Sequence, residues 1–212
     1  MRNKVYVSRD ARPELLEYLK ERGREVIFSE TLMNVAHPIR NHPDLIYCRL
    51  KDDMVFKGDS ALLGERYPLD VRYNACSTGR YFIHALEYTD ERLLEACDEL
   101  GLIKVNVRQG YSKCSITQVD EESIITYDEG IFKACTRAGL DVLLISPGHV
   151  KLEGYDTGFM GGASGKIGDE ILFNGDISAH PDFERIASFI EKKGLRIRYF
   201  REFPLTDIGT IV

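Results

Sequence analysis

The stretch IFKACTRAGLDVLLI (residues 131–145) decides the fold of this chain. Ile131, Ala134 and Cys135 recur at helical spacing and predict one buried helical face, and Gly139 supplies the left-handed residue at which helices commonly end. The near-continuous apolar run after this glycine predicts a short strand that is buried on both faces. One local pattern thus predicts a helix, a glycine stop and a strand.

The same pattern occurs three more times. Apolar residues at helical spacing precede Gly23, Gly101 and Gly194, and a strand is expected shortly after each of these glycines. The strands expected after the four glycines span residues 25–28, 103–107, 141–145 and 196–200. Pairs of strands are expected ahead of the helices, at 45–48 with 54–56, 74–77 with 81–83, 114–117 with 124–126 and 164–167 with 171–173. The unit that follows Phe56 is the poorest, since only residues 59–65 remain for about two helical turns.

These repeats predict an α/β fold in which about five strand–strand–helix–strand (ββαβ) units surround a pseudo-fivefold axis, in a single domain of residues 1–212. Lone strands expected at residues 4–8 and 206–212 would pair and close the ring, which protects sheet edges. The alternative is an open α/β sheet whose strands are joined one at a time by helices. Two strands precede each helix here, with turns too short for a crossover, and this favours the ring.

Composition excludes several classes of function. The net charge of −6 argues against nucleic acid as the primary partner, because phosphate binding needs a concentrated positive surface. No apolar stretch approaches the roughly 18–20 residues that span a bilayer, and the first apolar run is too short for a signal peptide. The five cysteines form no CxxC pair and are interpreted as reduced thiols. We therefore expect a cytoplasmic protein with no membrane or nucleic-acid partner.

The repeat resembles the pentein fold of the guanidino-group-modifying enzymes (GME), an α/β propeller of ββαβ units. That superfamily includes arginine deiminases, agmatine deiminases and amidinotransferases, and also the ribosome-binding translation initiation factor six. The whole sequence is similar to an uncharacterised bacterial family assigned to this fold. The resemblance implies a polar channel on the ring axis, a cysteine nucleophile that attacks a guanidinium carbon, a histidine acid/base and acidic residues that hold the cationic substrate.

The segment GYSKCS (residues 110–115) is similar to the family's glycine-rich start of a strand that ends in His-Cys-Ser/Thr, with Lys113 in place of the histidine. The resemblance makes Cys114 the candidate nucleophile, while the simpler alternative is a small buried thiol on a strand. The enzymes carry their catalytic cysteine in the last unit, where this chain has residues 206–212 and no cysteine. The family's nucleophile is therefore absent from its usual place.

The segment HPDLIYCR (residues 42–49) is similar to the deiminase segment that delivers an Arg-Asp pair into the channel. Arg49 matches the arginine, Leu50 replaces the aspartate, and Asp44 is the candidate to supply the anion. A loop-to-strand connection made rigid by its proline is the alternative. The same tripeptide recurs at residues 180–182 as a helix start, so His-Pro-Asp is not by itself a functional signature.

His149 follows a predicted buried strand, a position that commonly leads into a site in α/β folds, and is the candidate channel histidine. The segment GFMGGASGK (residues 158–166) lacks the spacing of a phosphate-binding loop, and its glycines predict a close approach of the backbone near the axis. The candidate substrate-binding residues are Arg49, Lys113, Asp156, Ser164 and Lys166. No His, Cys and Asp group has a recognised ligand spacing, so no metal or cofactor is predicted.

Two functions follow from these residues. The first is an amidinohydrolase- or amidinotransferase-like enzyme that uses Cys114, His149 and Asp44 on a small guanidino or amino compound in the axial channel. The second is a non-catalytic binding protein with a macromolecular partner such as the ribosome, and the missing cysteine of the last unit favours this alternative.

Overall fold

The helix–glycine–strand pattern forms helices where its apolar spacing predicts them. In the computed structural model, which describes residues 4–212, the four expected helices are α1 (Pro13–Glu21), α2 (Glu91–Glu99), α4 (Glu129–Ala138) and α5 (Phe183–Lys192). The side chains of Asp90 and Asp128 accept hydrogen bonds from the first turns of α2 and α4. The glycines after the four helices all have φ between 65° and 99°, the left-handed region in which a residue with a Cβ is strained. Each helix therefore ends where the sequence predicts.

The strands of residues 4–212 are short and form five small sheets. Their bounds are β1 (Lys4–Val7), β2 (Glu25–Phe28), β3 (Tyr47–Lys51), β4 (Met54–Lys57), β5 (Cys76–Ser77), β6 (Tyr81–His84), β7 (Ile103–Asn106), β8 (Ile116–Gln118), β9 (Ser123–Thr126), β10 (Asp141–Leu144), β11 (Ser164–Ile167), β12 (Glu170–Phe173) and β13 (Arg196–Arg198). Each strand after a helix pairs in parallel with the strand before that helix, as β7 does with β6. In three sheets (β5–β6–β7, β8–β9–β10 and β11–β12–β13) another strand pairs antiparallel ahead of the helix, which completes a ββαβ unit.

Two sheets lack part of this unit. Within residues 4–212, the pair β1–β2 flanks α1 but has no antiparallel strand of its own, and the β3–β4 hairpin has no helix. Only a 3₁₀ turn, Ser60–Leu62, follows β4. The helix expected over residues 59–65 is therefore wrong. Leu63 is the one buried residue there, so the segment has no apolar stripe to pack.

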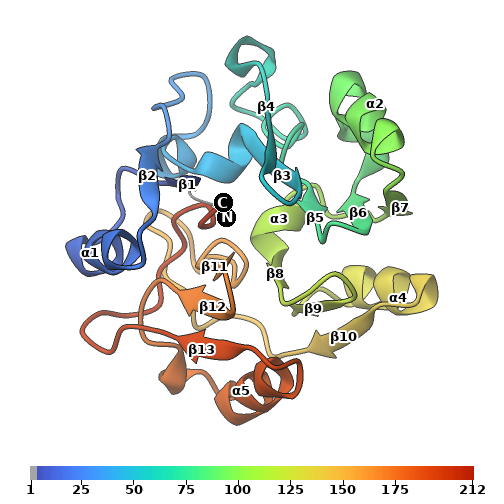
Figure 1. The fold of residues 1–212 in the computed structure, drawn as a ribbon. Coiled ribbons are helices and arrows are strands. Elements are labelled where there is room, and N and C mark those ends of the chain that lie inside the picture. The colour runs from blue at the N-terminus through green and yellow to red at the C-terminus, as the bar shows by residue number, and fades with distance from the viewer. Residues whose placement is uncertain (1–3) are drawn as a thin grey trace.

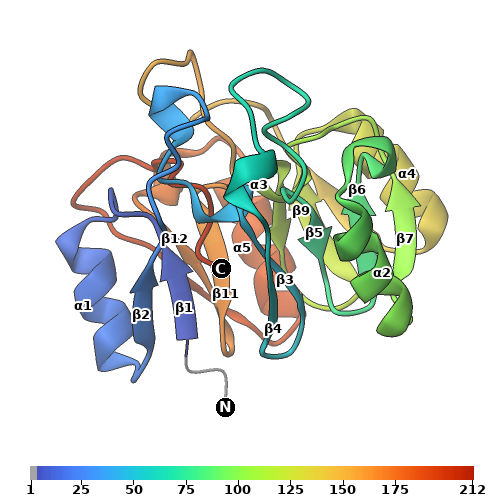
Figure 2. The ribbon, with the colours of Figure 1, turned by 90° about the horizontal axis from the view of Figure 1, so that it is seen from above.

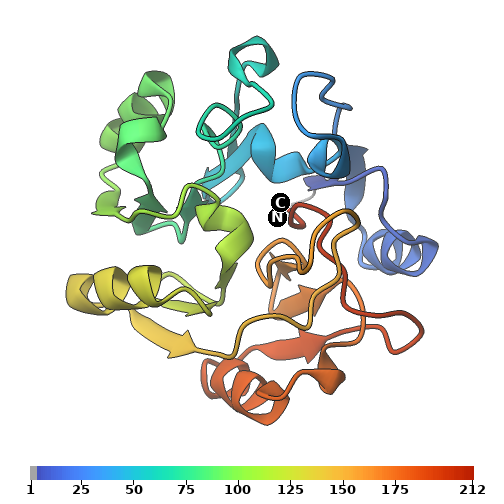
Figure 3. The same cartoon turned by 180° about the vertical axis from the view of Figure 1, so that it is seen from behind.

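The five sheets lie around a common centre (Figure 1). The helices α1, α2, α4 and α5 lie on the outside, while α3 (Ser112–Ser115) and the segment that ends at Val212 lie near the centre, as the view from behind also shows (Figure 3). The loops after β2, β4 and β10 project at one end, opposite the turn of the β3–β4 hairpin (Figure 2). Because the strands of residues 4–212 form separate sheets, the alternative of one open α/β sheet is wrong.

The outer helices join neighbouring sheets through shared apolar clusters. Leu15 and Leu19 of α1 are buried in one cluster with Leu172 of β12. Ile131 of α4 is likewise buried with Ile83 of β6. Burying one such side chain contributes about 1.5–3 kcal/mol, so these clusters hold each unit to the next. Within residues 4–212, no helix has the length and apolar character that a membrane crossing requires.

Residues far apart in the sequence meet at the centre. The N–H of Tyr6 donates to the C=O of Val212 at 2.8 Å, and the N–H of Val212 donates back to Tyr6 at 3.0 Å. The strand expected over residues 206–212 does not form, because the N–H of Thr210 turns instead to the C=O of Gly162 at 2.7 Å. The expected pairing of the two segments is thus reduced to a single residue pair.

Cys114 lies on a helix and not on a strand. The strand expected over residues 114–117 begins only at Ile116, and Cys114 belongs to α3. The Oδ1 atom of Asn74 accepts hydrogen bonds from the N–H groups of Lys113 (3.0 Å) and Cys114 (3.2 Å). A side chain about 40 positions away therefore stabilises a helical turn that the local pattern does not show.

Because His84 of β6 is buried, we expect the folded protein to be less stable at acidic pH. His84 is fully buried, its Nε2–H donates to the C=O of Gly110 at 2.8 Å, and its Nδ1 lies 2.7 Å from the hydroxyl of Thr89. Burial lowers the pKa of His84 from 6.5 to about 4. The unfolded chain then binds the proton more tightly, so stability is lost as the pH falls from 6.5 toward 4. We expect the free energy of unfolding to fall by about 2 kcal/mol between pH 7 and pH 5 through this residue.

Urea unfolding at the two pH values measures this effect. His84→Gln is expected to be less stable at pH 7, because it loses the buried hydrogen bonds, but to lack this part of the pH dependence. The two proteins are compared by how much the free energy of unfolding changes with pH. The difference between them gives the contribution of His84, separate from that of the other histidines. An equal fall in unfolding free energy in both proteins would contradict the prediction.

Candidate active site

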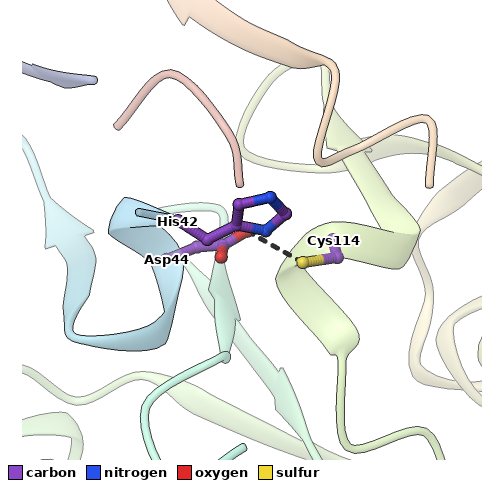
Figure 4. Close-up of side chains that lie close together, drawn as sticks. All are labelled: His42, Asp44 and Cys114. Atoms are coloured by element: carbon purple, nitrogen blue, oxygen red, sulfur yellow. Dashed lines mark hydrogen bonds between the residues drawn. The ribbon is translucent and has the colours of Figure 1, made fainter. Parts of the chain in front are cut away.

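Three chemically active side chains from two distant segments meet near the centre of the molecule. His42 and Asp44 flank the proline of a 3₁₀ turn (Pro43–Leu45), and Cys114 comes from α3 (Figure 4). The Cys114 thiol donates to Asp44 Oδ2 at 2.9 Å, and one donor atom from each of the three residues lies within 4.8 Å of the others. All three side chains are buried, with 0–4% of their surface exposed.

Backbone contacts fix the two segments relative to each other. The N–H of Asp44 donates to the C=O of Gly209 at 3.2 Å, which ties the 3₁₀ turn to the segment 206–212. Asn74 holds α3 through the two N–H groups described above, and its Nδ2 lies 3.2 Å from the sulfur of Cys114. The thiol is therefore held between a carboxylate and an amide.

The segment 206–212 supplies two further groups. The Thr210 hydroxyl donates to Asp44 Oδ2 at 2.9 Å, the same oxygen that the Cys114 thiol contacts. Asp207 accepts hydrogen bonds from the N–H groups of Phe159 and Gly209, each at 2.9 Å, and its Oδ1 lies 3.9 Å from Nδ1 of His42. This segment thus lies beside Cys114, although it contributes no cysteine itself.

The glycine-rich segment makes this arrangement possible. A Cβ atom on Gly162 would overlap the carboxylate of Asp207, and one on Gly161 would lie 2.5 Å from the C=O of Cys114. Real Cβ atoms essentially never lie that close to other heavy atoms. The expected close approach of the backbone at these glycines is confirmed.

Burial sets the protonation of the four groups. It lowers the pKa of His42, an effect that the charges of Asp44 and Asp10 partly oppose, so the imidazole is neutral and its contact with Asp207 is not an ion pair. Burial also raises the pKa of Asp44, and it raises the pKa of Asp207 to about 6 against the hydrogen bonds that Asp207 accepts. The pKa of Cys114 is raised well above its usual value by burial and by both carboxylates.

The two carboxylates lack a cationic partner. Within residues 4–212, neither Asp44 nor Asp207 forms an ion pair with a lysine or arginine, and Oδ1 of Asp44 is buried with no hydrogen-bond partner. A buried carboxylate without compensation is costly in free energy, and such groups cluster at functional sites. The site therefore favours a ligand that brings positive charge.

A cavity opens on this group. Its volume is about 70 Å³, enough for a few water molecules or the head of a small ligand. It is lined by Ile39, His42, Leu45, Tyr111, Cys114, Leu152, Tyr155, Thr157, Phe159 and Asp207. Apolar and aromatic walls thus surround a thiol, an imidazole and a carboxylate.

The structure does not bring His149 to this cavity. His149 is exposed, and its ring packs edge-on against His180 with the centroids 5.2 Å apart. Gly148 and His149 both have left-handed φ values, 88° and 64°, and turn the chain away after β10. Asp156 is also exposed, in the loop between two lining residues of the cavity. Ser164 is buried and its hydroxyl contacts Thr117 at 2.8 Å, so it is not part of the lining.

The three basic candidates lie together but elsewhere. Arg49, Lys113 and Lys166 line a second, narrower cavity of about 20 Å³ with Ser77 and other residues. Successive residues of a helix point roughly 100° apart. Lys113 and Cys114 are adjacent on α3 and so face different cavities. Three of the five expected substrate-binding residues therefore line the second cavity, and none of the five lines the cavity beside Cys114.

Sequence reasoning missed His42, Asn74, Asp207 and Thr210. The available signal for His42 was its place two residues before Asp44 in a proline turn, which brings both side chains to one side. The second His-Pro-Asp tripeptide, at residues 180–182, made the first look uninformative. In that second copy, the N–H of Asp182 donates to Nδ1 of His180. Asn74, Asp207 and Thr210 have contacts with Lys113, Phe159 and Asp44 that span 39–166 positions and leave no local pattern.

A family model matches most of the chain. Described as a family of unknown function (DUF6873), it covers residues 54–212. The chain belongs to this family. No curated protein and no solved structure matches the chain. The region that the family model covers contains Asn74, Cys114 and Asp207, whereas His42 and Asp44 precede it.

The packing of Gly162 against Asp207 predicts that Gly162→Ala is destabilising. The new Cβ would overlap the carboxylate, so Asp207 or the backbone must move, with a loss of about 2–4 kcal/mol in unfolding free energy. Gly101→Ala is the matched control, because its Cβ would meet nothing within 4 Å and only the left-handed backbone opposes it, at about 1 kcal/mol. Chemical unfolding of both variants measures the difference, and equal losses would contradict the packing argument.

Proposed function

We propose that this protein is a pentein-like α/β propeller with a site for a small guanidino or amino compound in the cytoplasm. Support for the fold comes from the five small sheets around a common centre, three of which are complete ββαβ units. Support for the function comes from one observation. Cys114, His42 and Asp44 meet beside a cavity that also contains the carboxylate of Asp207.

The charges of the site favour a cationic substrate. A guanidinium is planar and carries N–H donors that match carboxylate oxygens. Oδ1 of Asp44 lacks a donor, and Asp207 reaches the cavity directly. A guanidinium bound in the cavity donates to Asp207 and brings positive charge next to Asp44, whose carboxylate does not itself line the cavity. The rings of Tyr111 and Phe159, 6.0 Å apart at the cavity wall, give its plane an aromatic surface.

The reaction that these groups support is nucleophilic substitution at the guanidinium carbon. His42 takes the proton of the Cys114 thiol, and the sulfur forms a bond to the carbon. The bond from this carbon to one nitrogen then breaks, and the nitrogen leaves with the proton from His42. A water molecule gives a proton to His42 and its oxygen to the carbon, and the carbon–sulfur bond breaks as the sulfur takes the proton back. An amine in place of this water gives the transferase version.

Substrate binding also answers the difficulty of forming the thiolate. In the empty site the pKa of Cys114 is raised by burial and by two carboxylates, so the thiol keeps its proton. A cation beside the sulfur stabilises the thiolate and offsets the carboxylates. Cys114 is therefore reactive mainly when a cationic compound is bound.

Turnover of guanidino compounds tests this proposal. The purified chain is incubated with arginine, agmatine and related compounds, and released ammonium, urea or amine is measured. We expect turnover by the natural chain, a loss of about 10³-fold or more in Cys114→Ala, and a loss of about 10²–10⁴-fold in His42→Gln. Cys97→Ala is the matched control, because Cys97 is an equally buried thiol on α2, outside the cavity.

Two outcomes would contradict the proposal. Turnover that persists in Cys114→Ala excludes this thiol as the nucleophile. A guanidino compound that binds, as shown by calorimetry, without any turnover would make the chain a non-catalytic binding protein. Iodoacetamide labelling separates the cases further, since the substrate should change the alkylation rate of Cys114 and leave that of Cys97 unchanged.

A further inference from the structure

The residues at the centre also have the composition of a metal site. His42, Asp44 and Cys114 each offer one ligand atom, and the three atoms lie within 4.8 Å of one another. No spacing in the sequence indicates this set, because Asp44 and Cys114 are 70 positions apart. We infer that these three residues bind one Zn²⁺ ion, and that this ion blocks the thiol and inhibits the activity proposed above.

The donor set selects the class of metal. Thiolate and imidazole ligands favour zinc and related late transition metals over Mg²⁺ and Ca²⁺, which prefer oxygen. Tetrahedral zinc places its sulfur, nitrogen and oxygen ligands about 3.3–3.6 Å from one another. The Cys114–Asp44 distance of 2.9 Å must open slightly, and the longer separations, which extend to 4.8 Å, must close by about 1.5 Å at most.

An independent observation points to a missing cation. Among residues 4–212, Oδ1 of Asp44 is buried and has no hydrogen-bond partner, whereas Oδ2 accepts hydrogen bonds from Cys114 and Thr210. A carboxylate oxygen that faces no donor has a lone pair available for a metal ion. A metal ligand in proteins is commonly oriented by a neighbouring carboxylate, and Asp207 lies 3.9 Å from Nδ1 of His42.

The cavity provides the fourth ligand position and the route to it. His42 and Cys114 both line it, so an ion that arrives there meets two ligands at once. Its volume of about 70 Å³ leaves room for a water molecule on the metal. On binding, Cys114 releases its proton to solvent and forms a sulfur–zinc bond, with no change of oxidation state. Binding rests on geometry alone, whereas inhibition rests on the proposed function.

Cobalt spectroscopy tests the binding directly. Co²⁺ takes the place of Zn²⁺ in such sites, and a thiolate ligand gives it a charge-transfer absorption band. The full chain is titrated with Co²⁺ after removal of metal by a chelator. We expect one equivalent to produce this band, Zn²⁺ to abolish it, Cys97→Ser to retain it and Cys114→Ser to lose it. His42→Gln should weaken binding by about tenfold or more.

A measurement on the natural chain keeps the test independent of folding defects in the variants. Because the buried thiol of the empty site is alkylated only slowly, its reaction with iodoacetamide is followed over hours by mass spectrometry. Zn²⁺ alone should slow alkylation of Cys114 further, and a chelator should restore the rate. Alkylation of Cys114 at an unchanged rate, or a cobalt band that persists in Cys114→Ser, overturns the metal site. If the chain binds zinc but turns over no guanidino compound, the proposed function and the inhibition are excluded, and the metal site is retained. If the chain turns over a guanidino compound but gives no cobalt band, only the metal site is excluded.

Discussion

The backbone of Gly162 is the constraint on which the centre of this molecule depends. Its C=O accepts hydrogen bonds from the N–H groups of Ile208 (3.1 Å) and Thr210 (2.7 Å), and its N–H donates to the C=O of Cys114 at 2.9 Å. Three segments, α3, the glycine-rich segment and residues 206–212, are thus tied at one residue. Only a residue without a side chain leaves space for the carboxylate of Asp207. The positions of Asp207 and Cys114 therefore depend on a glycine, which has no side chain to take part in a reaction.

The buried carboxylates of Asp44 and Asp207 determine which ligands suit this centre. Asp207 recovers part of its desolvation cost through two backbone donors, whereas Asp44 keeps one oxygen without a partner. Proteins tolerate such costs mainly where a ligand later offsets them. A guanidinium and a zinc ion offset the same charges by different bonds, so the two ligands are expected to compete for one place. The neutral His42 is common to both, as a proton acceptor for one and as a ligand for the other.

The sequence predicted what is local and missed what is not. Helix ends followed from apolar spacing and left-handed glycines, both of which act within one turn. Cys114 and Asp44 were singled out and do meet, but the helix that carries Cys114 depends on Asn74, which no local pattern connects to it. His149 was expected in the channel because it follows a strand, and two left-handed residues turn it outward instead. Contacts such as those of Asn74 with Cys114 join segments that are far apart in the chain, so no single segment of the sequence predicts them.

The pairing of Tyr6 with Val212 has a consequence for the order of events in folding. Contacts between residues so distant in the chain require closure of a long loop, and such closures slow folding. The hydrogen bond from Thr210 to Asp44 spans 166 positions and belongs to the same closure. A chain in which residues 206–212 have not yet docked therefore leaves Asp44 without the Thr210 hydroxyl and Cys114 without its neighbours from this segment. The arrangement around Cys114 is thus complete only once this long-range closure has formed.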